Sequence, residues 1–219
     1  MKKKTMIFIL SILLLVGGFF IVRSVTQTGV TALDDSFTRE FLDEDVKVGD
    51  GFYLFESRNG KYDMVFPEDF HIVSPGYESS ERFESLRLLF EDVMNGVNVT
   101  KNIQIDYRGR DQQRKSDYER DFERSLQAHS FEMQYQEYEN NGYLIKHGSS
   151  YLTLNGNEVV ATNPEEYNPN TYFAIISTSD YSQYILLRYR IICEEEHCNS
   201  NKEQEDNFFK ELIEGIQFN

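Results

Sequence analysis

The sequence predicts an α+β domain with a central antiparallel β-sheet and covering helices, preceded by an N-terminal transmembrane helix. A predominantly apolar run follows a cluster of lysines at the start of the chain. Alternating apolar and polar residues recur through the middle of the chain, separated by tight-turn signals, and this pattern indicates β-strands. Two segments, 111–128 and 202–218, repeat apolar residues every three or four positions, which indicates amphipathic helices.

The apolar run covers Thr5 to Val22 and has the length of a membrane-spanning helix. Its 18 residues span roughly 27 Å as a helix, close to the thickness of the hydrocarbon core of a bilayer. Three lysines precede it and are expected to stay in the cytoplasm under the positive-inside rule. We therefore expect residues 1–23 to form cytoplasmic lysines plus a single-pass signal anchor in the bacterial cytoplasmic membrane, with the C-terminal domain outside. Secretion after signal cleavage is the alternative.

Outside the cytoplasm, the two cysteines of the chain are expected to form a disulfide. Cys193 and Cys198 are close in sequence, so a turn brings their Cα atoms within the roughly 4.4–6.8 Å that the bond needs. A metal site that includes His197, a redox pair and two free thiols are the alternatives. No cysteine follows the apolar run, so the usual lipid attachment of bacterial lipoproteins has no residue there.

The exported part of the chain is strongly acidic. The whole chain carries a net charge of −15, and removing residues 1–23 takes away four of the 22 basic residues and none of the 37 acidic ones, which leaves −19. Such a domain repels nucleic acid and anionic lipid surfaces, so we expect no nucleic-acid partner. The charge favours solubility, and it also suits a cationic ligand.

The folded domain is expected to begin near Gly51. Residues 24–50 combine weak periodicity with many acids, and we interpret them as an acidic juxtamembrane linker with a helical turn around Phe37 and Phe41. The extracytoplasmic α+β domain then covers 51–219. Its length suits a single domain.

Two hairpins open the predicted domain. Residues 51–73 form two strand patterns around Asn59-Gly60, a pair that favours a tight turn because both residues accept a positive φ. The segment 83–109 fits both helix and strand periodicity. A second Asn-Gly pair, at 95–96, favours the hairpin.

The rest of the chain combines helices and strands. Tyr118, Phe122 and Leu126 lie on one face of the predicted helix 111–128. Strand patterns follow at 131–139, 143–147, 150–154, 158–162, 171–179 and 183–193. The pattern at 202–218 predicts the closing helix. Short turns between strands require antiparallel pairing, so the helices must cover one or both faces of an antiparallel sheet.

The segments "YDMVFPEDFHIV", "VTKNIQIDYRG" before the first helix, and "NFFKELIEGIQF" at the end occur in an order that resembles PsbP-like domains. The likeness covers roughly residues 52–219, and it extends to small anchored envelope proteins and lipoproteins of spore-forming bacteria. The resemblance implies an α/β/α sandwich with a central antiparallel sheet and a non-catalytic accessory or binding role. It supplies no functional residue.

No motif of catalysis, cofactor binding or metal binding stands in the sequence. The four histidines are His71, His129, His147 and His197. They are far apart and show no metal-ligand spacing. No nucleophile elbow, phosphate loop or dinucleotide fingerprint occurs. The acidic segment 43–51 fails as an EF-hand loop because its fifth and sixth positions are lysine and valine.

Two weaker features have plain interpretations. The adjacent acids at 165–166 and 194–196 lie in expected loops, where a solvated charge is the plain interpretation and glycoside hydrolysis the alternative. The tyrosines between 135 and 189 fill a β-surface or stack on sugars or peptides. The sequence therefore predicts no catalytic residue, no cofactor and no metal.

These observations favour a non-catalytic binding or assembly accessory at the outer face of the cytoplasmic membrane. Its expected partners are the membrane, through the N-terminal helix, and an envelope protein or peptide. An envelope hydrolase that assembles Asp, Glu or His side chains in the fold is one alternative. A protective binder of cationic peptides is the other.

Overall fold

The computed structural model describes residues 28–94, 96–109, 115–128, 135–155, 158–162, 167–193 and 200–219. No helix among these residues is long and apolar enough to cross a membrane. The apolar run 5–22 lies outside them, so the membrane-spanning helix stays a prediction.

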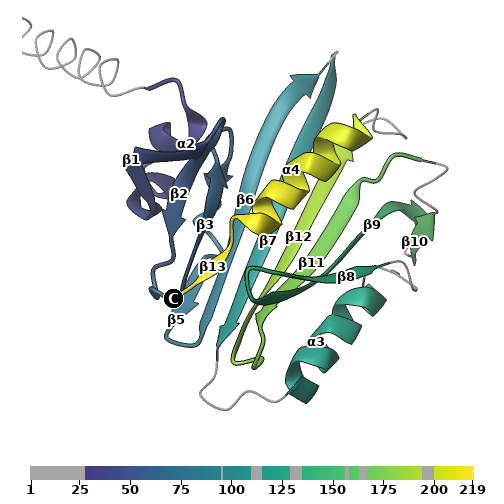
Figure 1. Cartoon of the computed structure of the whole chain (residues 1–219). Coiled ribbons are helices and arrows are strands. Elements are labelled where there is room, and N and C mark those ends of the chain that lie inside the picture. Colours follow the sequence, from purple (N-terminus) through teal and green to yellow (C-terminus); the bar gives the residue numbers. More distant parts are fainter. Residues whose placement is uncertain are drawn as a thin grey trace, which may run out of the picture.

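The domain contains two antiparallel sheets rather than the single sheet that the sequence predicted (Figure 1). The four-stranded sheet has the order β1-β2-β3-β13, with β1 (Leu42–Gly49), β2 (Phe52–Glu56), β3 (Tyr62–Pro67) and β13 (Gln217–Phe218). The nine-stranded sheet has the order β10-β9-β11-β12-β7-β6-β4, with β5 paired to β6 and β8 paired to β9. Its strands are β4 (His71–Ile72), β5 (Glu78–Ser80), β6 (Phe83–Met94), β7 (Val97–Gly109), β8 (Gln136–Asn140), β9 (Tyr143–Asn155), β10 (Glu158–Thr162), β11 (Thr171–Thr178) and β12 (Gln183–Cys193).

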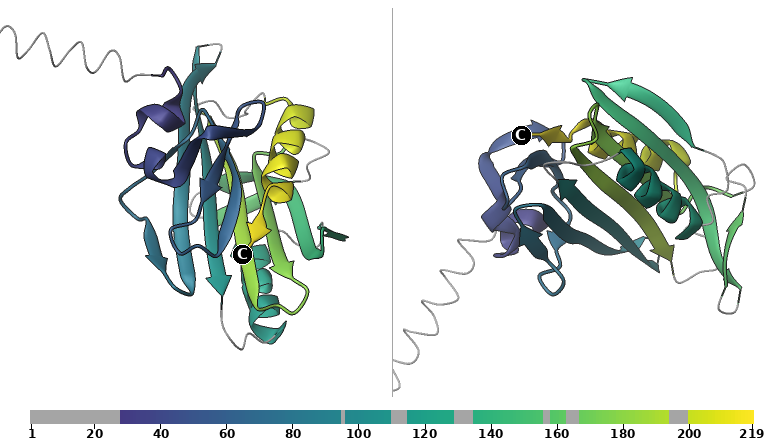
Figure 2. Two further views of the ribbon diagram at one scale, coloured as in Figure 1. Left: turned by 60° about the vertical axis from the view of Figure 1, so that its left-hand side comes forward. Right: turned by 90° about the horizontal axis from the view of Figure 1, so that it is seen from below.

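Helices cover both faces of the nine-stranded sheet. The described helices are α2 (Thr31–Asp34), the 3₁₀ helix η1 (Thr38–Phe41), α3 (Lys115–Ala128) and α4 (Lys202–Glu214). The four-stranded sheet and α4 share one face, and α3 packs on the opposite one (Figures 1 and 2). The prediction of an α+β fold with antiparallel strands and covering helices is confirmed at this level.

Alternation along β12 shows how one strand serves both faces. Ile185, Leu187 and Tyr189 belong to the main core, whereas Tyr184 and Leu186 pack toward α3. Successive side chains of a strand point to opposite faces, so a strand with apolar residues at almost every position must be covered on both sides. This explains why the predicted strand 171–179 and the first half of the predicted strand 183–193 are apolar at almost every position.

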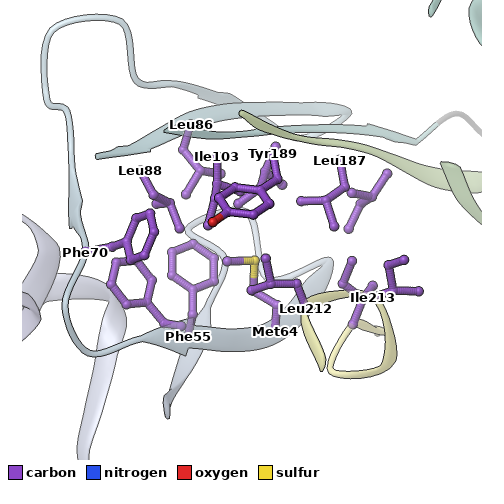
Figure 3. Close-up of a cluster of buried hydrophobic side chains, with 14 of the residues drawn as sticks. Phe55, Met64, Phe70, Leu86, Leu88, Ile103, Leu187, Tyr189, Leu212 and Ile213 are labelled. Carbon is purple, nitrogen blue, oxygen red and sulfur yellow. The ribbon is translucent and has the colours of Figure 1, made fainter. Parts of the chain in front are cut away.

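The main core lies between the nine-stranded sheet and the layer made by the four-stranded sheet and α4 (Figure 3). The side chains labelled in the close-up are Phe55, Met64, Phe70, Leu86, Leu88, Ile103, Leu187, Tyr189, Leu212 and Ile213. All are at most 3% exposed. Rings make up much of this core, and Phe55 stacks at 5.5 Å on Phe41 and at 6.2 Å on Phe66 between ring centroids.

Both predicted hairpins are present. β2 pairs with β3, and Gly60 in the turn has a φ of +65°. β6 pairs with β7 over their whole length, and Gly96 has a φ of +83°. The positive φ of each glycine agrees with the Asn-Gly signal, whereas Asn59 does not have the positive φ that the signal also predicts.

The linker predicted at 24–50 is wrong over most of its length. Ala32 and Phe41 are buried in the main core, at 0% and 4% exposed. The Thr38 hydroxyl accepts a hydrogen bond from the Ile72 backbone N–H at 2.8 Å. η1 and β1 extend the fold to the N-terminal side of Gly51, because their few apolar residues, spaced among acids, fill the end of the core.

The closing helix is shorter than predicted. α4 ends at Glu214, and residues 217–218 form β13, which pairs with β3. A Cβ placed on Gly215 would lie 2.5 Å from the Val65 side chain. The helix therefore ends where the chain passes tightly over β3, and a residue without a side chain is needed there.

Two further predictions concern β9 and the cysteines. The strands predicted at 143–147 and 150–154 are one continuous strand, β9.

Cys193 ends β12 and is not a free thiol. Cys198 lies outside the described residues, so the Cys193–Cys198 disulfide stays a prediction.

Candidate functional site

A cleft of about 930 Å³ opens between α4 and the hairpin formed by β8 and β9. Its lining residues are Tyr135, Gln136, Tyr138, Glu139, Asn140, His147, Gly148, Ser149, Tyr172, Lys202, Asp206, Asn207, Phe209, Lys210, Ile213 and Glu214. This volume is within the range of small-molecule sites, roughly 300–1,000 Å³. Aromatic, amide, hydroxyl, carboxylate and ammonium groups all contribute to the walls.

A buried polar network fixes the helical wall. The Lys101 ammonium on β7 donates to Glu205 Oε1 at 2.7 Å, and the Tyr189 hydroxyl donates to Glu205 Oε2 at 2.5 Å. The side chains of Lys101 and Glu205 are 16% and 7% exposed. A buried carboxylate must keep such partners, because an unpaired buried charge costs several kcal/mol. The network therefore holds the first turn of α4 on the sheet.

The other wall is a hairpin with a tight turn. Asn141 and Gly142 between β8 and β9 both have positive φ, +51° and +81°. The register places Gln136 opposite His147, and Tyr138 opposite the buried Ile145. Residues two apart on a strand share a face, so Gln136 and Tyr138 point to the same side as His147.

His147 is the titratable group at the centre of the hairpin wall. It is half-buried, and its ring meets the Tyr138 ring edge-on with 5.6 Å between the centroids. Burial lowers the pKa of His147 from 6.5, and the nearby Asp206 carboxylate opposes this shift in part. The imidazole is therefore neutral at pH 7, and it offers one hydrogen-bond donor and one acceptor.

Tyr172 lies at the base of the cleft. Its ring stacks at 5.5 Å on Tyr189, and its hydroxyl has no hydrogen-bond partner in the part of the chain that the structure describes. Burial first, and then the Asp206 carboxylate, raise the pKa of Tyr172. The hydroxyl is thus protonated and lies beside Asp206 at the buried base of the cleft.

The charges around the cleft nearly cancel. Lys202 and Lys210 face three carboxylates, and Lys210 already lies 3.7 Å from Glu214. Among the described residues, no group of three or more His, Cys, Asp or Glu side chains is placed to hold a metal ion. The described hydrogen bonds include none between His147 and Asp206 or Ser149. The walls thus offer hydrogen-bond donors and acceptors together with charges of both signs.

The two histidines that the structure describes lie apart from each other. His147 lines the cleft, and His71 lies on β4, paired with Leu89 of β6. His129 and His197 lie outside the described residues, as do the acid pairs 165–166 and 194–196. No catalytic or metal-binding residue was predicted.

The cleft itself was not predicted, although part of its signal stands in the sequence. Lys202, Asp206, Lys210 and Glu214 recur every four residues, which places them on one face of α4. The opposite wall, formed by the β8–β9 hairpin, lies more than fifty residues earlier in the chain. Only the folded structure shows that the polar face of α4 lies toward this hairpin.

A protein-family model described as "Putative lipoprotein YvcA" matches residues 28–217 of the chain. No curated protein matches the chain. Among solved structures, the chain is similar to the Ran-binding protein Mog1p of Saccharomyces cerevisiae. That match covers 76% of this chain and 94% of Mog1p, at 9% sequence identity and a TM-score of 0.45. The expected resemblance to bacterial lipoproteins is confirmed by the family match, and the relation to PsbP-like domains stays a prediction.

Proposed function

The chain belongs to the family described as "Putative lipoprotein YvcA", and we propose that it is a non-catalytic binding protein held at the outer face of the bacterial cytoplasmic membrane. The cleft between α4 and the β8–β9 hairpin is its ligand site. The observation that carries this proposal is a concave site of about 930 Å³ whose walls are both polar and aromatic.

The family description and the apolar run 5–22 both support membrane attachment. A lipoprotein carries its lipid on a cysteine near the end of the signal, and the cysteines of this sequence are Cys193 and Cys198. We therefore attribute the attachment to the helix rather than to a lipid. Alkaline phosphatase fused behind Asn219 should be active, and a fluorescent protein that matures only in the cytoplasm should stay dark. The reverse pattern would contradict the location, and release of the fusion into the medium would favour the cleaved form.

The chemistry of the walls favours an uncharged ligand rich in hydroxyl groups, such as an oligosaccharide. Such a ligand needs groups that donate and accept together, and Gln136, Asn207 and the neutral His147 do both. A strongly cationic ligand would meet Lys202, and a strongly anionic one would meet Asp206. Near-neutral walls disfavour both.

An aromatic ring at the rim supports the same ligand class. Tyr138 lines the cleft and is half-buried. The apolar faces of sugar rings pack against aromatic faces, while the tyrosine hydroxyls stay available for hydrogen bonds. A saccharide would thus use both properties of this rim.

A tryptophan placed in the cleft gives a direct test, because the chain contains no tryptophan. The Tyr138→Trp variant of the full chain is titrated with chitotriose, an uncharged trisaccharide, and its emission is followed. We expect a saturable change in emission. The Phe83→Trp variant, whose reporter lies at the start of β6, should show none.

Two further probes address the alternatives. Saturable binding of a tri-lysine peptide, with no response to chitotriose, would favour the binder of cationic peptides. Release of shorter sugars during the titration would favour the hydrolase. Unchanged emission of the Tyr138→Trp variant on addition of chitotriose would reject the saccharide as the ligand of this cleft.

A further inference from the structure

The face of the nine-stranded sheet opposite the main core is only partly covered by the described elements. α3 packs over β11 and the start of β12, through Tyr184 and Leu186. Further along, over β6, β7 and the second half of β12, apolar side chains remain exposed, with Val93 at 60% and Ile192 at 47%. We call this region the open face. It comprises Arg87, Leu89, Asn102, Gln104, Asp106, Arg188, Arg190 and Ile192.

Strand register places the cations of the open face in two adjacent rows. The first row is Arg87–Gln104–Arg188 and the second is Leu89–Asn102–Arg190. Residues directly opposite each other on neighbouring strands share a face. Strands lie about 4.8 Å apart and residues two apart on a strand about 7 Å apart. Three arginine side chains therefore start within about 12 Å of one another.

The three arginine side chains of the open face differ in their hydrogen bonds. Arg188 donates to Asp106 Oδ2 at 2.9 Å, and Asp106 Oδ1 also accepts from Ser85 at 2.7 Å and from Gln104 at 3.1 Å. This network fixes the position of one guanidinium. Arg87 and Arg190 are exposed, and no ion pair or hydrogen bond of their side chains is found among the described residues. Two cations are thus free to meet a partner beside one that is already oriented.

The sign of this patch is opposite to that of the molecule. The two rows together with Asp106 carry a net charge of +2, whereas the whole chain carries −15. In the neighbouring rows Glu91 offsets Arg108, and Glu78 opposite Ser85 adds one negative charge, so the wider region keeps a net charge of +1. A local positive field on an acidic protein attracts an anionic group from solution while the remaining surface repels it.

We propose that the open face is a docking surface for an acidic segment of a partner protein. Arginine recognises carboxylates in a paired, planar geometry and is enriched at the energetic centres of protein interfaces. Leu89 and Ile192 lie beside the cations and give a polypeptide an apolar surface to cover. A phosphate polymer would gain nothing from these apolar groups, and both a phosphate polymer and an anionic membrane would meet the Asp106 carboxylate.

Spacing specifies the segment further. Arg188 and Arg190 are two residues apart on β12, so carboxylates at positions i and i+2 of an extended segment match their separation of about 7 Å. The residue between the two acids points away from the sheet along such a segment, so the backbone and the side-chain methylenes of the acids cover Leu89 and Ile192. The partner chemistry is therefore an extended stretch in which acidic residues alternate with other residues.

The test uses the full chain in nanodiscs of zwitterionic lipid and a fluorescent 12-residue peptide that repeats Glu-Leu-Glu-Ser. The double variant Arg87→Gln/Arg190→Gln removes two cations that have no partner to lose. Arg120→Gln/Arg124→Gln removes two exposed cations from α3 and is the matched control. We expect at least tenfold weaker peptide binding in the first variant and an unchanged affinity in the second. Binding to wild type should also fall as salt rises.

Each other outcome overturns the proposal. Equal loss in both double variants would show unspecific attraction, and equal binding of the Gln-Leu-Gln-Ser peptide would show that charge does not matter. Absence of peptide binding to the wild-type chain would reject the surface. Tighter binding of polyphosphate or of phosphatidylglycerol vesicles, lost in Arg87→Gln/Arg190→Gln, would assign the face to phosphate groups instead of a protein. These results are independent of the cleft, because the open face lies on the opposite side of the sheet.

Discussion

Leu88 and Leu89 are neighbours on β6, and they point to opposite faces of the nine-stranded sheet. Leu88 is 0% exposed in the main core, under the layer of the four-stranded sheet and α4. Leu89 is half-buried, between Arg87 and Glu91 on its own strand. One face of the sheet is closed by packing, and over β6 and β7 the described elements leave the other face to solvent.

The difference separates stability from recognition. The closed face buries rings and aliphatic side chains against a second layer, which is the main source of folding free energy. Buried polar groups of this face, such as Glu84 and Glu205, keep hydrogen-bond partners, and other polar groups line the cleft at its rim. The open face contributes little packing of its own. Its arginines and exposed apolar side chains are better explained by contact with a partner.

The adjacent leucines provide the largest expected effect. Leu88→Ala should lower the free energy of unfolding by about 2–5 kcal/mol, because it leaves a cavity in a closed core. Leu89→Ala should cost about 1 kcal/mol or less. Chemical denaturation followed by circular dichroism measures both. Equal losses would show that the two faces are packed alike.

The polar network under α4 gives the next effect. Glu205→Gln removes the charge that Lys101 and Tyr189 bind, and we expect a loss of about 2–3 kcal/mol in the free energy of unfolding. Glu203→Gln, at an exposed position two residues earlier, should change it by about 0.5 kcal/mol or less. Adding Lys101→Met to Glu205→Gln should restore part of the loss. A purely additive double variant would argue against a coupled pair.

The predicted disulfide lies at the end of β12, one residue after the exposed Ile192. Mass spectrometry of the exported chain without reduction should show a Cys193–Cys198 bond. Replacing both cysteines with serine should cost about 2 kcal/mol, because the bond closes only a short loop. Detection of two free thiols would contradict the prediction and would weaken the argument for an oxidising compartment.

The smallest effect concerns pH and the rim of the closed face. Burial lowers the pKa of His147 below 6.5 in the folded chain, so the unfolded chain binds the proton more readily. The contribution of neutral His147 to the free energy of unfolding is fully present above pH 6.5. It is lost as the pH falls from there toward the lower pKa of His147 in the folded chain. His147→Gln should therefore reduce the loss of stability between pH 7 and pH 5. Identical pH profiles for the variant and the wild type would contradict the shift.

Local sequence signals predicted the parts of the fold that depend on neighbouring residues. The two Asn-Gly pairs predicted both hairpins, and the apolar spacing of Tyr118 and Phe122 predicted the helix that covers the second face. These signals are short-range, since a turn or an amphipathic stripe is set within a few residues.

Elements that depend on distant partners were missed. Residues 217–218 look like the end of a helix until β3, more than 150 residues earlier, offers them a strand to pair with. The many acidic residues of 24–50 obscure the apolar signal of Phe41 in the sequence. Its ring stacks on Phe55, a contact that exists only in the folded chain. The cleft belongs to the same class, because its two walls meet only after the sheet and α4 are assembled.

The most direct test of the central claim, that the cleft is the ligand site, compares two substitutions that remove the same charge. Asp206→Asn changes the cleft beside His147 and Tyr172, and Asp69→Asn changes an exposed position away from it. Both are placed in the Tyr138→Trp background and titrated with chitotriose. We predict about tenfold weaker binding for Asp206→Asn, as expected when a hydrogen bond to a charged group is lost, and unchanged binding for Asp69→Asn. Equal affinities in the two variants would contradict the assignment of the cleft.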